Sequence, residues 1–272
     1  MHSSKELKEI IDRSLSTFLP EADKYTSLLE ESENYSLSAG GKRLRPCILM
    51  AVCEMLGGKI EDAVPFAAAL EFIHTYSLVH DDLPAMDNDD MRRGKPSCHK
   101  AYGEDIAILT GDALLTRALD IMANELAKDT VRNKAIAMNT ISNAAYMMVR
   151  GQVSDIKAGD SPDEDYLVYV HRNKTAALFI AAFTAGAYLA DPSEAAVSDM
   201  LDLGKYFGLA FQLYDDYLDF ETDDCLNYSQ ILGKEKTAQK YREYMNCVSS
   251  ILNKYDNNGA LKDLCAIGDI NG

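Results

Sequence analysis

The chain has 272 residues, with 43 acidic and 27 basic side chains and a formal net charge of −16. This charge argues against a general nucleic-acid binder, which needs a basic face, so any phosphate-bearing ligand must meet local positive charge or metal. No linker rich in proline, glycine or serine divides the chain, and its length can bury a large core. We therefore expect a single domain over residues 1–272.

The cysteines form no CxxC pair and lie far apart, at positions 47, 53, 98, 225, 247 and 265. This usage predicts reduced thiols in a cytoplasmic protein. The amino terminus has no apolar signal core, and no later stretch reaches the roughly eighteen apolar residues that a membrane-spanning helix needs. We expect no stable insertion into a membrane.

Apolar residues recur at helical spacing along almost the whole chain. Helices are predicted over residues 3–18 and 21–37, before two glycines and three cations interrupt the pattern at residues 38–46. Further helices are predicted over residues 62–82, 107–126, 131–157, 163–190 and 193–220. Alternation with period two is almost absent, so the predicted fold is all-α, a single large bundle of about ten or more helices.

Five aspartates fall within ten residues where the helix predicted over residues 62–82 ends, at positions 81, 82, 87, 89 and 90. Carboxylates so close together repel one another unless cations lie among them, and Arg92 and Arg93 follow at once. Pro84 cannot continue the hydrogen bonds of a helix. We expect it to break the helix and let Asp87 fold back towards Asp81.

A second acidic cluster, DDYLD at residues 215–219, lies in the last of these predicted helices. Residues four apart share one helix face, so Asp215 and Asp219 point the same way and Asp216 flanks them. Hard oxygen ligands of this kind suit magnesium, which typically bridges one or two carboxylates to phosphate oxygens. Facing clusters would therefore form a metal site.

Simpler explanations of the acidic clusters exist. Each could be a solvated helix end, although two clusters on apolar helices, with basic motifs elsewhere, favour a site. A calcium-binding EF-hand loop fails on its spacing. Counted from Asp81, Met86 stands where that loop needs glycine and Arg93 where it needs glutamate.

Several further motifs accompany the two clusters in a fixed order. They are SAGGKRLRP at residues 38–46, HTYSLVH at 74–80, RRGKP at 92–96, GDALL at 111–115, GQ at 151–152, KT at 174–175 and FQ at 211–212. In motif order, spacing and identity, residues 1–220 resemble the trans-prenyl diphosphate synthases, most of all the bacterial farnesyl diphosphate synthases. A DDxxD motif alone would not be specific.

The resemblance implies an all-α bundle of the isoprenoid synthase type around a central cavity, usually as a homodimer. It implies a prenyltransferase that condenses isopentenyl diphosphate with dimethylallyl or geranyl diphosphate to give farnesyl diphosphate. Three magnesium ions would hold the allylic diphosphate between the two motifs. The metal ligands that the resemblance implies are Asp81, Asp82, Asp87, Asp215, Asp216 and Asp219.

The resemblance also implies the residues that contact the substrates. Arg92 would contact the allylic diphosphate. The residues that would hold isopentenyl diphosphate are Lys42, Arg45, His74 and Arg93. Those that would face the developing allylic cation are Lys174, Thr175 and Gln212. Simpler roles stay open for them: the cations could balance an acidic surface, the histidine could be a satisfied core residue, and the polar residues could bond to backbone.

Product length follows from the same resemblance. In the bacterial farnesyl enzymes an aromatic residue five positions before the first motif blocks the tunnel for the growing chain. Tyr76 is five positions before Asp81 and would lie roughly 7.5 Å below the rim at 1.5 Å per residue. The resemblance therefore implies a fifteen-carbon product, with Tyr76 and Ser77 as the chain-length residues.

The sequence departs from the family after Asp219. The family continues through a loop with a GKxxGxD element and a further lysine, whereas here the loop near residues 220–228 is short, and Lys234 and Lys236 look like the start of the next helix. Either the deletion is genuine and weakens or abolishes catalysis, or the sequence omits part of the natural chain. A catalytically weak binding subunit therefore stays open as an alternative, and so does a terpene cyclase, which the paired basic motifs oppose.

Overall fold

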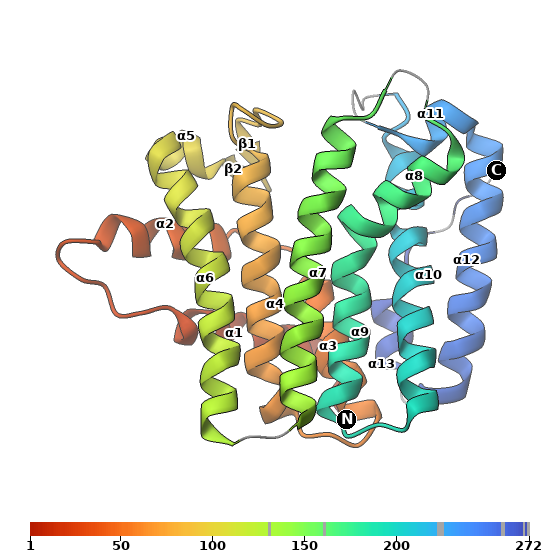
Figure 1. Ribbon diagram of the computed structural model, residues 1–272, viewed down its shortest axis with the longest axis horizontal. Helices are drawn as coiled ribbons and strands as arrows, with labels where there is room; N and C mark the ends of the chain where they lie inside the picture. The colour runs from red at the N-terminus through yellow and green to blue at the C-terminus, as the bar shows by residue number, and fades with distance from the viewer. Residues whose placement is uncertain (130–131, 160–161, 222–225, 257–258, 269, 271–272) are drawn as a thin grey trace.

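A computed structural model describes residues 1–129, 132–159, 162–221, 226–256, 259–268 and 270. These residues form a helical bundle, which confirms the predicted all-α fold (Figure 1). The helices of the first half are α1 (Ser4–Leu15), α2 (Ser27–Leu37), α3 (Leu44–Met55), α4 (Ile60–Asp81), α5 (Cys98–Tyr102) and α6 (Glu104–Lys128). Those of the second half are α7 (Arg132–Ile156), α8 (Glu164–His171), α9 (Ala177–Leu189), α10 (Glu194–Leu218), α11 (Tyr228–Leu232), α12 (Lys234–Tyr255) and α13 (Ala260–Leu264).

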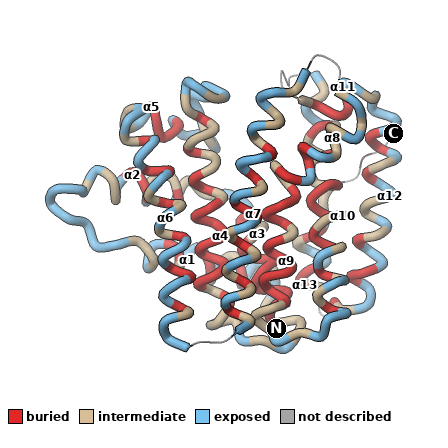
Figure 2. Tube along the Cα trace, in the orientation of Figure 1, coloured by how far each residue is buried: buried red, intermediate tan, exposed pale blue. Residues whose placement is uncertain are grey.

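The core lies along α3, α4 and α9, which are buried on most sides (Figure 2). Helix α4 packs against α3, α6 and α9, and α9 packs in turn against α7 and α10. Both α4 and α9 are apolar around their whole circumference, as expected of helices without a solvent face. The C-terminal ends of α4, α7 and α10 lie at the same end of the bundle, at the top of Figure 1.

Two predicted helices differ from the structure. The helix predicted from residue 21 begins only at Ser27, because the Asp23 Oδ1 accepts a hydrogen bond from the Tyr25 N–H (2.8 Å) in a local turn that competes with the helix. The span predicted over residues 163–190 is interrupted by a π-helical turn, η2 (Arg172–Ala176), between α8 and α9. Single π turns of this kind often occur at functional sites.

The described cysteines are free thiols, in agreement with the expectation from their spacing, while Cys225 lies outside the described residues. Most of them are buried, and burial raises the pKa of the Cys47 and Cys53 thiols to about 12. These thiols pack as small apolar residues. Within the described ranges, no helix combines the length and the apolar character needed to cross a membrane.

Helix α9 approaches α3 so closely that Gly186 has no room for a side chain. A Cβ atom there would lie 2.4 Å from the Leu49 carbonyl oxygen. We expect Gly186→Ala to lower the free energy of unfolding by about 1–3 kcal/mol, the usual cost of overpacking a core. Gly159→Ala is the matched control, since no atom lies within 4 Å of that position. Equal midpoints for the two variants in urea denaturation would contradict the close contact.

Candidate functional site

Helix α4 ends at Asp81. Pro84 cannot continue the helix, and the chain turns back on itself. The Asp87 N–H donates a hydrogen bond to the Asp81 carbonyl oxygen (2.9 Å), so the predicted break and return of the chain are confirmed. Burial, together with the nearby Asp87 carboxylate, raises the pKa of Asp81 to about 6. Burial raises the pKa of Asp87 as well.

Asp82 points away from its two neighbours and holds Arg92. Its buried carboxylate accepts a hydrogen bond from the Arg92 Nε (2.9 Å) and pairs with the same guanidinium through Nη2. Arg92 lies in a small hairpin formed by β1 (Met91–Arg92) and β2 (Lys95–Pro96). The turn residues Arg93 and Gly94 have φ angles of 53° and 78°, as a two-residue type I′ turn requires.

The second acidic cluster also contains one aspartate, Asp216, whose side chain faces the protein interior. Asp215 and Asp219 border a cavity, whereas the Asp216 side chain is 2% exposed. Burial, with a further contribution from Asp219, raises the pKa of Asp215 to about 6. The Asp216 Oδ1 accepts from the Gln212 Nε2 (2.7 Å), and its Oδ2 accepts from the Tyr228 N–H (2.8 Å). This geometry does not favour Asp216 as a metal ligand, since a metal would have to displace these bonds.

The two clusters meet across a cavity of about 590 Å³ at the end of the bundle. Its lining residues are Asp87, Asp89, Arg92, Asp155, Val170, His171, Lys174, Thr175, Gln212, Asp215, Asp219 and Leu226. Asp81 lies beside this lining, close enough to Lys174 for each to shift the other's pKa. We refer to this space as the acidic cavity.

Among the described residues, no three carboxylate, imidazole or thiol groups lie close enough together to enclose a metal ion by themselves. Magnesium usually takes only one or two carboxylates and completes its shell with water and phosphate oxygens. The carboxylates of the acidic cavity fit that pattern. Asp81 and Asp87 on one wall, and Asp215 and Asp219 on the other, could share magnesium ions with an anionic ligand.

The π turn η2 places Lys174 and Thr175 in the acidic cavity. Burial opposes the charge of Lys174, but the Asp155 carboxylate, 2.5 Å from its Nζ, raises the pKa of this lysine. Helix α7 comes so close to η2 that a Cβ atom at Gly151 would lie 2.2 Å from the backbone nitrogen of Lys174. The Gly151 position in the GQ motif is therefore explained by close packing of α7 on this turn.

Asp155 and His171 line the acidic cavity, although no motif in the sequence pointed to them. Asp155 lies four residues after Gly151 and His171 four residues before Thr175, so each shares a helix face with a motif residue. Burial, followed by the charge of Lys174, lowers the pKa of His171 to about 4. Its ring is therefore neutral at pH 7.

A second cavity, of about 640 Å³, adjoins the first and is lined by cations. It brings together the four residues predicted to hold isopentenyl diphosphate, Lys42, Arg45, His74 and Arg93. The residues that line both cavities are Thr175, Gln212 and Asp215. We refer to this space as the basic cavity.

Arg45 is a partly buried cation that forms no ion pair with a described residue. Its Nε has no hydrogen-bond partner, and its guanidinium lies 4.2 Å from the centre of the Phe179 ring. Burial lowers the pKa of Arg45 to about 10 and, with the charge of Arg45, lowers that of His74 well below its usual value. Arg43 differs, since it pairs with Glu71 (2.6 Å) and Asp12 (2.9 Å). Arg45 thus presents an uncompensated charge to an anionic ligand.

The two glycines before Lys42 give Arg93 room to lie against the backbone. Arg93 donates a hydrogen bond to the Gly40 carbonyl oxygen, and a Cβ atom at Gly41 would lie 2.7 Å from the guanidinium carbon. Gly40 and Gly41 also have φ angles of 85° and 122°, which favour glycine. The GGKRLRP and RRGKP motifs therefore form one structure.

The two predicted chain-length residues lie one turn below the acidic rim on α4. Tyr76 is 6% exposed, and its ring contacts that of His80 edge-on at 5.9 Å. Its hydroxyl forms no hydrogen bond with a described residue. The Ser77 Oγ donates to the His74 carbonyl oxygen (2.9 Å). Tyr76 is therefore held by packing rather than by a hydrogen bond.

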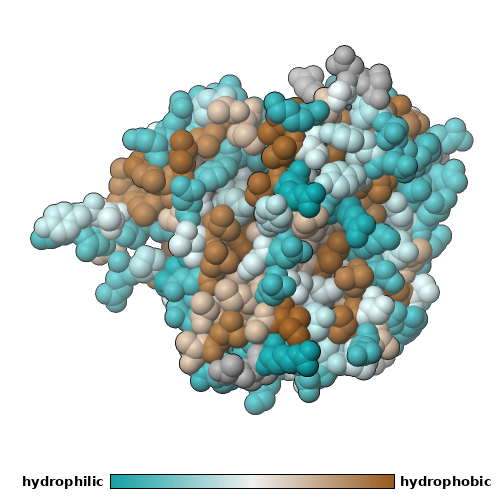
Figure 3. Space-filling model, in the orientation of Figure 1, coloured by the Kyte–Doolittle hydropathy of each residue, from teal (hydrophilic) through white to brown (hydrophobic). Residues whose placement is uncertain are grey.

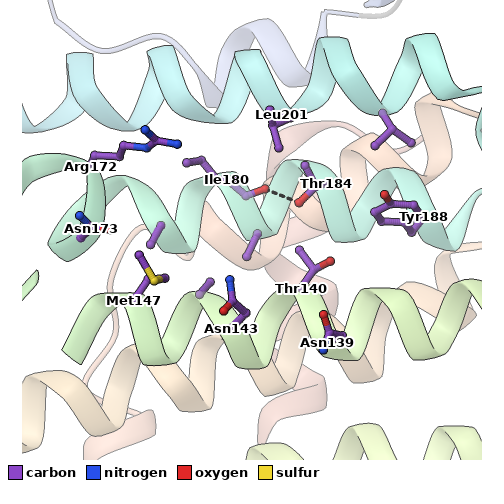
Figure 4. A pocket seen from close by; sticks show the side chains of 14 residues that line it. Asn139, Thr140, Asn143, Met147, Arg172, Asn173, Ile180, Thr184, Tyr188 and Leu201 are labelled. Carbon is purple, nitrogen blue, oxygen red and sulfur yellow. Dashed lines mark hydrogen bonds between the residues drawn. The ribbon is translucent and has the colours of Figure 1, made fainter. Parts of the chain in front are cut away.

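A third hollow lies between α7, α9 and α10 (Figure 4). It has a volume of about 350 Å³ and a lining of uncharged polar and apolar residues, with Arg172 as its one charged residue. In Figure 4 Asn139, Thr140 and Asn143 project into it from α7. Without a carboxylate in its lining, this hollow does not offer the magnesium chemistry of the acidic cavity.

Residues 222–225 of the shortened loop lie outside the described residues. On either side of them, the Gln230 Nε2 donates to the Phe220 carbonyl oxygen (2.9 Å). As predicted, α12 begins at Lys234, and Lys236 pairs with Glu164 (2.6 Å) on α8. The sequence has no lysine or arginine between Asp219 and Lys234. This side of the acidic cavity therefore gains no cation from the loop.

Comparison with known proteins agrees with these features. Residues 26–251 match the model of the polyprenyl synthetase family. The chain is 44% identical over 241 residues to a geranylgeranyl diphosphate synthase of Cyanophora paradoxa, covering 86% of this chain and 79% of that protein. It is 41% identical over 251 residues to a farnesyl diphosphate synthase of Bacillus subtilis, covering 86% and 84%. A solved structure of an FPP/GFPP synthase from Zymomonas mobilis superposes with a TM-score of 0.87 at 31% identity, covering 96% and 94%.

The raised pKa values of Asp81 and Asp215 predict that magnesium binding depends on pH. Both carboxylates are ionised at pH 7.5 and largely protonated at pH 5.5, so protons compete with the metal at the lower pH. The apparent affinity for magnesium should fall roughly tenfold between these pH values. Thermal unfolding with and without magnesium chloride at each pH measures this change. The Asp81→Asn/Asp215→Asn variant should lose the dependence, and an equal gain in stability at both pH values would contradict the prediction.

Proposed function

The chain is a prenyltransferase of the polyprenyl synthetase family, and on that premise we propose that it condenses isopentenyl diphosphate with dimethylallyl or geranyl diphosphate to give farnesyl diphosphate. One observation carries this proposal: Arg45, whose buried Nε has no hydrogen-bond partner, lies in a basic cavity that adjoins the acidic cavity. Two diphosphates can then be held side by side, one by cations of the protein and one by magnesium.

The acidic cavity would hold the allylic diphosphate. Its ligands to the metal would be the carboxylates that face the cavity, Asp81, Asp87, Asp215 and Asp219, with three magnesium ions in the complete site. Bound magnesium would neutralise the diphosphate as it leaves the allylic carbon. Arg92, which Asp82 holds in place, would contact the same diphosphate.

The basic cavity would hold isopentenyl diphosphate, with contacts from Lys42, Arg45, His74 and Arg93. The double bond of isopentenyl diphosphate would attack the allylic cation formed in the adjoining acidic cavity. The product would then lose a proton to the departed diphosphate. Thr175 and Gln212 line both cavities, so their oxygens lie where positive charge develops. The apolar residues beneath the rim keep water from the cation.

The absence of a cation in the loop after Asp219 supports a stronger dependence on magnesium. In a site with fewer protein cations, the metal supplies more of the charge that the diphosphate needs. The same absence favours a second candidate function, a catalytically weak subunit that binds diphosphates. A terpene cyclase is opposed by the basic cavity, because a cyclase acts on a single diphosphate.

A fifteen-carbon product is supported by Tyr76. Its large ring is buried on α4, one turn below the acidic rim, where it would block a longer chain. The relatives include enzymes named for farnesyl and for geranylgeranyl diphosphate, so family membership does not decide product length.

We also propose a homodimer formed through α6 and α7. Tyr146, Val149, Val153 and Ile156 are exposed and follow one face of α7 at spacings of three and four residues. Exposed apolar residues also occur on α6, and Figure 3 shows hydrophobic atoms among the hydrophilic ones on this side of the molecule. A second copy of the chain would bury this face. One relative, from Arabidopsis thaliana, is named as the large subunit of a heterodimer.

The proposed reaction can be tested with purified protein, isopentenyl diphosphate, geranyl diphosphate and magnesium. Farnesyl diphosphate is the expected product. Arg45→Met should raise the KM for isopentenyl diphosphate roughly tenfold or more, the usual cost of losing a buried contact to a charged group. Arg172→Met is the matched control, since Arg172 is exposed and outside both cavities. No elongation would support the binding subunit, and a cyclic hydrocarbon would support the cyclase.

Product length is tested by Tyr76→Ala. Removal of the ring should open space below the acidic cavity and shift the products to twenty carbons or more, as measured by chromatography of the dephosphorylated alcohols. Tyr25→Ala, at an exposed tyrosine that lines neither cavity, should leave product length unchanged. A fifteen-carbon product from the Tyr76 variant would refute the role of this residue.

A further inference from the structure

Asp216 belongs to a chain of hydrogen bonds that ends at the wall of the acidic cavity. Thr175 Oγ1 donates to the Gln212 Oε1 (2.5 Å), and the Gln212 Nε2 donates to the Asp216 Oδ1 (2.7 Å). Thr175 and Gln212 line both cavities, whereas Asp216 lines neither. The carboxylate is therefore connected to the site through these two residues.

Several groups behind the cavity hold Asp216 in place. The Tyr228 N–H donates to its Oδ2 (2.8 Å), and the His171 Nε2 lies 3.3 Å from the same oxygen. The Asn227 Nδ2 donates to its carbonyl oxygen (2.9 Å). Tyr228 and Asn227 are fully buried at the start of α11. The carboxylate is thus fixed by hydrogen bonds from α10 and from the start of α11, and the neutral His171 ring of α8 lies beside it.

Asp216 sets the direction of every bond in this chain. Both of its carboxylate oxygens accept hydrogen bonds, so Gln212 turns its NH₂ group towards Asp216 and its oxygen towards Thr175. Thr175 then has to donate its single hydroxyl proton to Gln212, and it forms no other hydrogen bond with a described residue. Only the lone pairs of its oxygen remain for the cavity.

We propose that Asp216 is a positioning residue that keeps the Thr175 oxygen facing the developing allylic cation with its lone pairs, and that it is not a metal ligand. This inference rests on the proposed function for the identity of the cation. A hydroxyl whose proton pointed into the cavity would repel positive charge, whereas a fixed oxygen dipole stabilises it without reorganisation.

The isosteric variant Asp216→Asn should reverse the chain of bonds. The oxygen of the new side-chain amide would still accept from the Tyr228 N–H, which leaves its NH₂ group to face Gln212. Gln212 would then turn its oxygen towards position 216 and its NH₂ group towards Thr175. Thr175 would accept that bond and point its proton into the cavity.

Equilibrium binding of two probes measures this reversal without turnover. One is a bisphosphonate with a short ammonium arm, and the other carries an uncharged alkyl arm of equal length, both with saturating magnesium. Wild-type protein should bind the ammonium probe more tightly in calorimetry. Asp216→Asn should reduce this preference about tenfold and change the affinity for the alkyl probe less than about threefold. Asp215→Asn, in contrast, should weaken the binding of both probes equally, because it removes a metal ligand.

The double variant Asp216→Asn/Gln212→Glu restores the original direction of the bond between Thr175 and residue 212, with the same total charge as the wild-type protein. The carboxylate introduced at position 212 can accept both from the amide at position 216 and from Thr175, so the preference for the ammonium probe should return. Thr175→Val in that background should abolish it again, which shows that the hydroxyl carries the effect. Thermal unfolding checks that each variant is folded.

Two results would overturn the proposal. One is an equal loss of affinity for both probes in Asp216→Asn, as expected if Asp216 were a metal ligand. The other is an unchanged preference of this variant for the ammonium probe. Neither result depends on catalysis. A protein that shows the predicted preferences but forms no elongated product would instead refute the proposed function.

Discussion

The structure depends on a balance of charge at one end of the bundle. Five carboxylates line the acidic cavity, and the two cations in its lining are already engaged, Arg92 by Asp82 and Lys174 by Asp155. Burial, with a further contribution from the neighbouring carboxylates Asp87 and Asp219, raises the pKa of Asp81 and Asp215. A cation that arrives with the substrate would complete the balance, as expected of a site for magnesium and a diphosphate.

Each acidic motif divides its adjacent aspartates between two tasks. The first of each pair, Asp81 or Asp215, lies at the acidic cavity, while the second is buried and holds another functional side chain. Asp82 holds Arg92, and Asp216 holds Gln212. A pair of adjacent aspartates on a helix points in two directions about 100° apart, so one residue can face the ligand while its neighbour organises the wall. This division explains why both members of a pair matter although they differ in exposure.

Much of this site could be predicted because it depends on local rules. Pro84 cannot continue α4, which ends three residues before it, and the two glycines beside Lys42 mark a close approach of backbone and side chain. The burial of Asp216, the π turn at Lys174 and the roles of Asp155 and His171 depend on which helices pack together. Four-residue spacing in the sequence places Asp215 and Asp219 on one face of the helix. It does not show that Asp216, between them, turns towards α11. The late start of α2 likewise follows from one side-chain bond of Asp23.

We propose that two adjoining cavities bind diphosphates by different means, one through magnesium and one through cations of the protein. Calorimetric titration of isopentenyl diphosphate and of geranyl diphosphate, each with magnesium and with a chelator, tests it most directly. Isopentenyl diphosphate should bind with similar affinity in both conditions, because Lys42, Arg45 and Arg93 need no metal. Geranyl diphosphate should bind well only with magnesium. Equal dependence of both ligands on the metal would contradict the account.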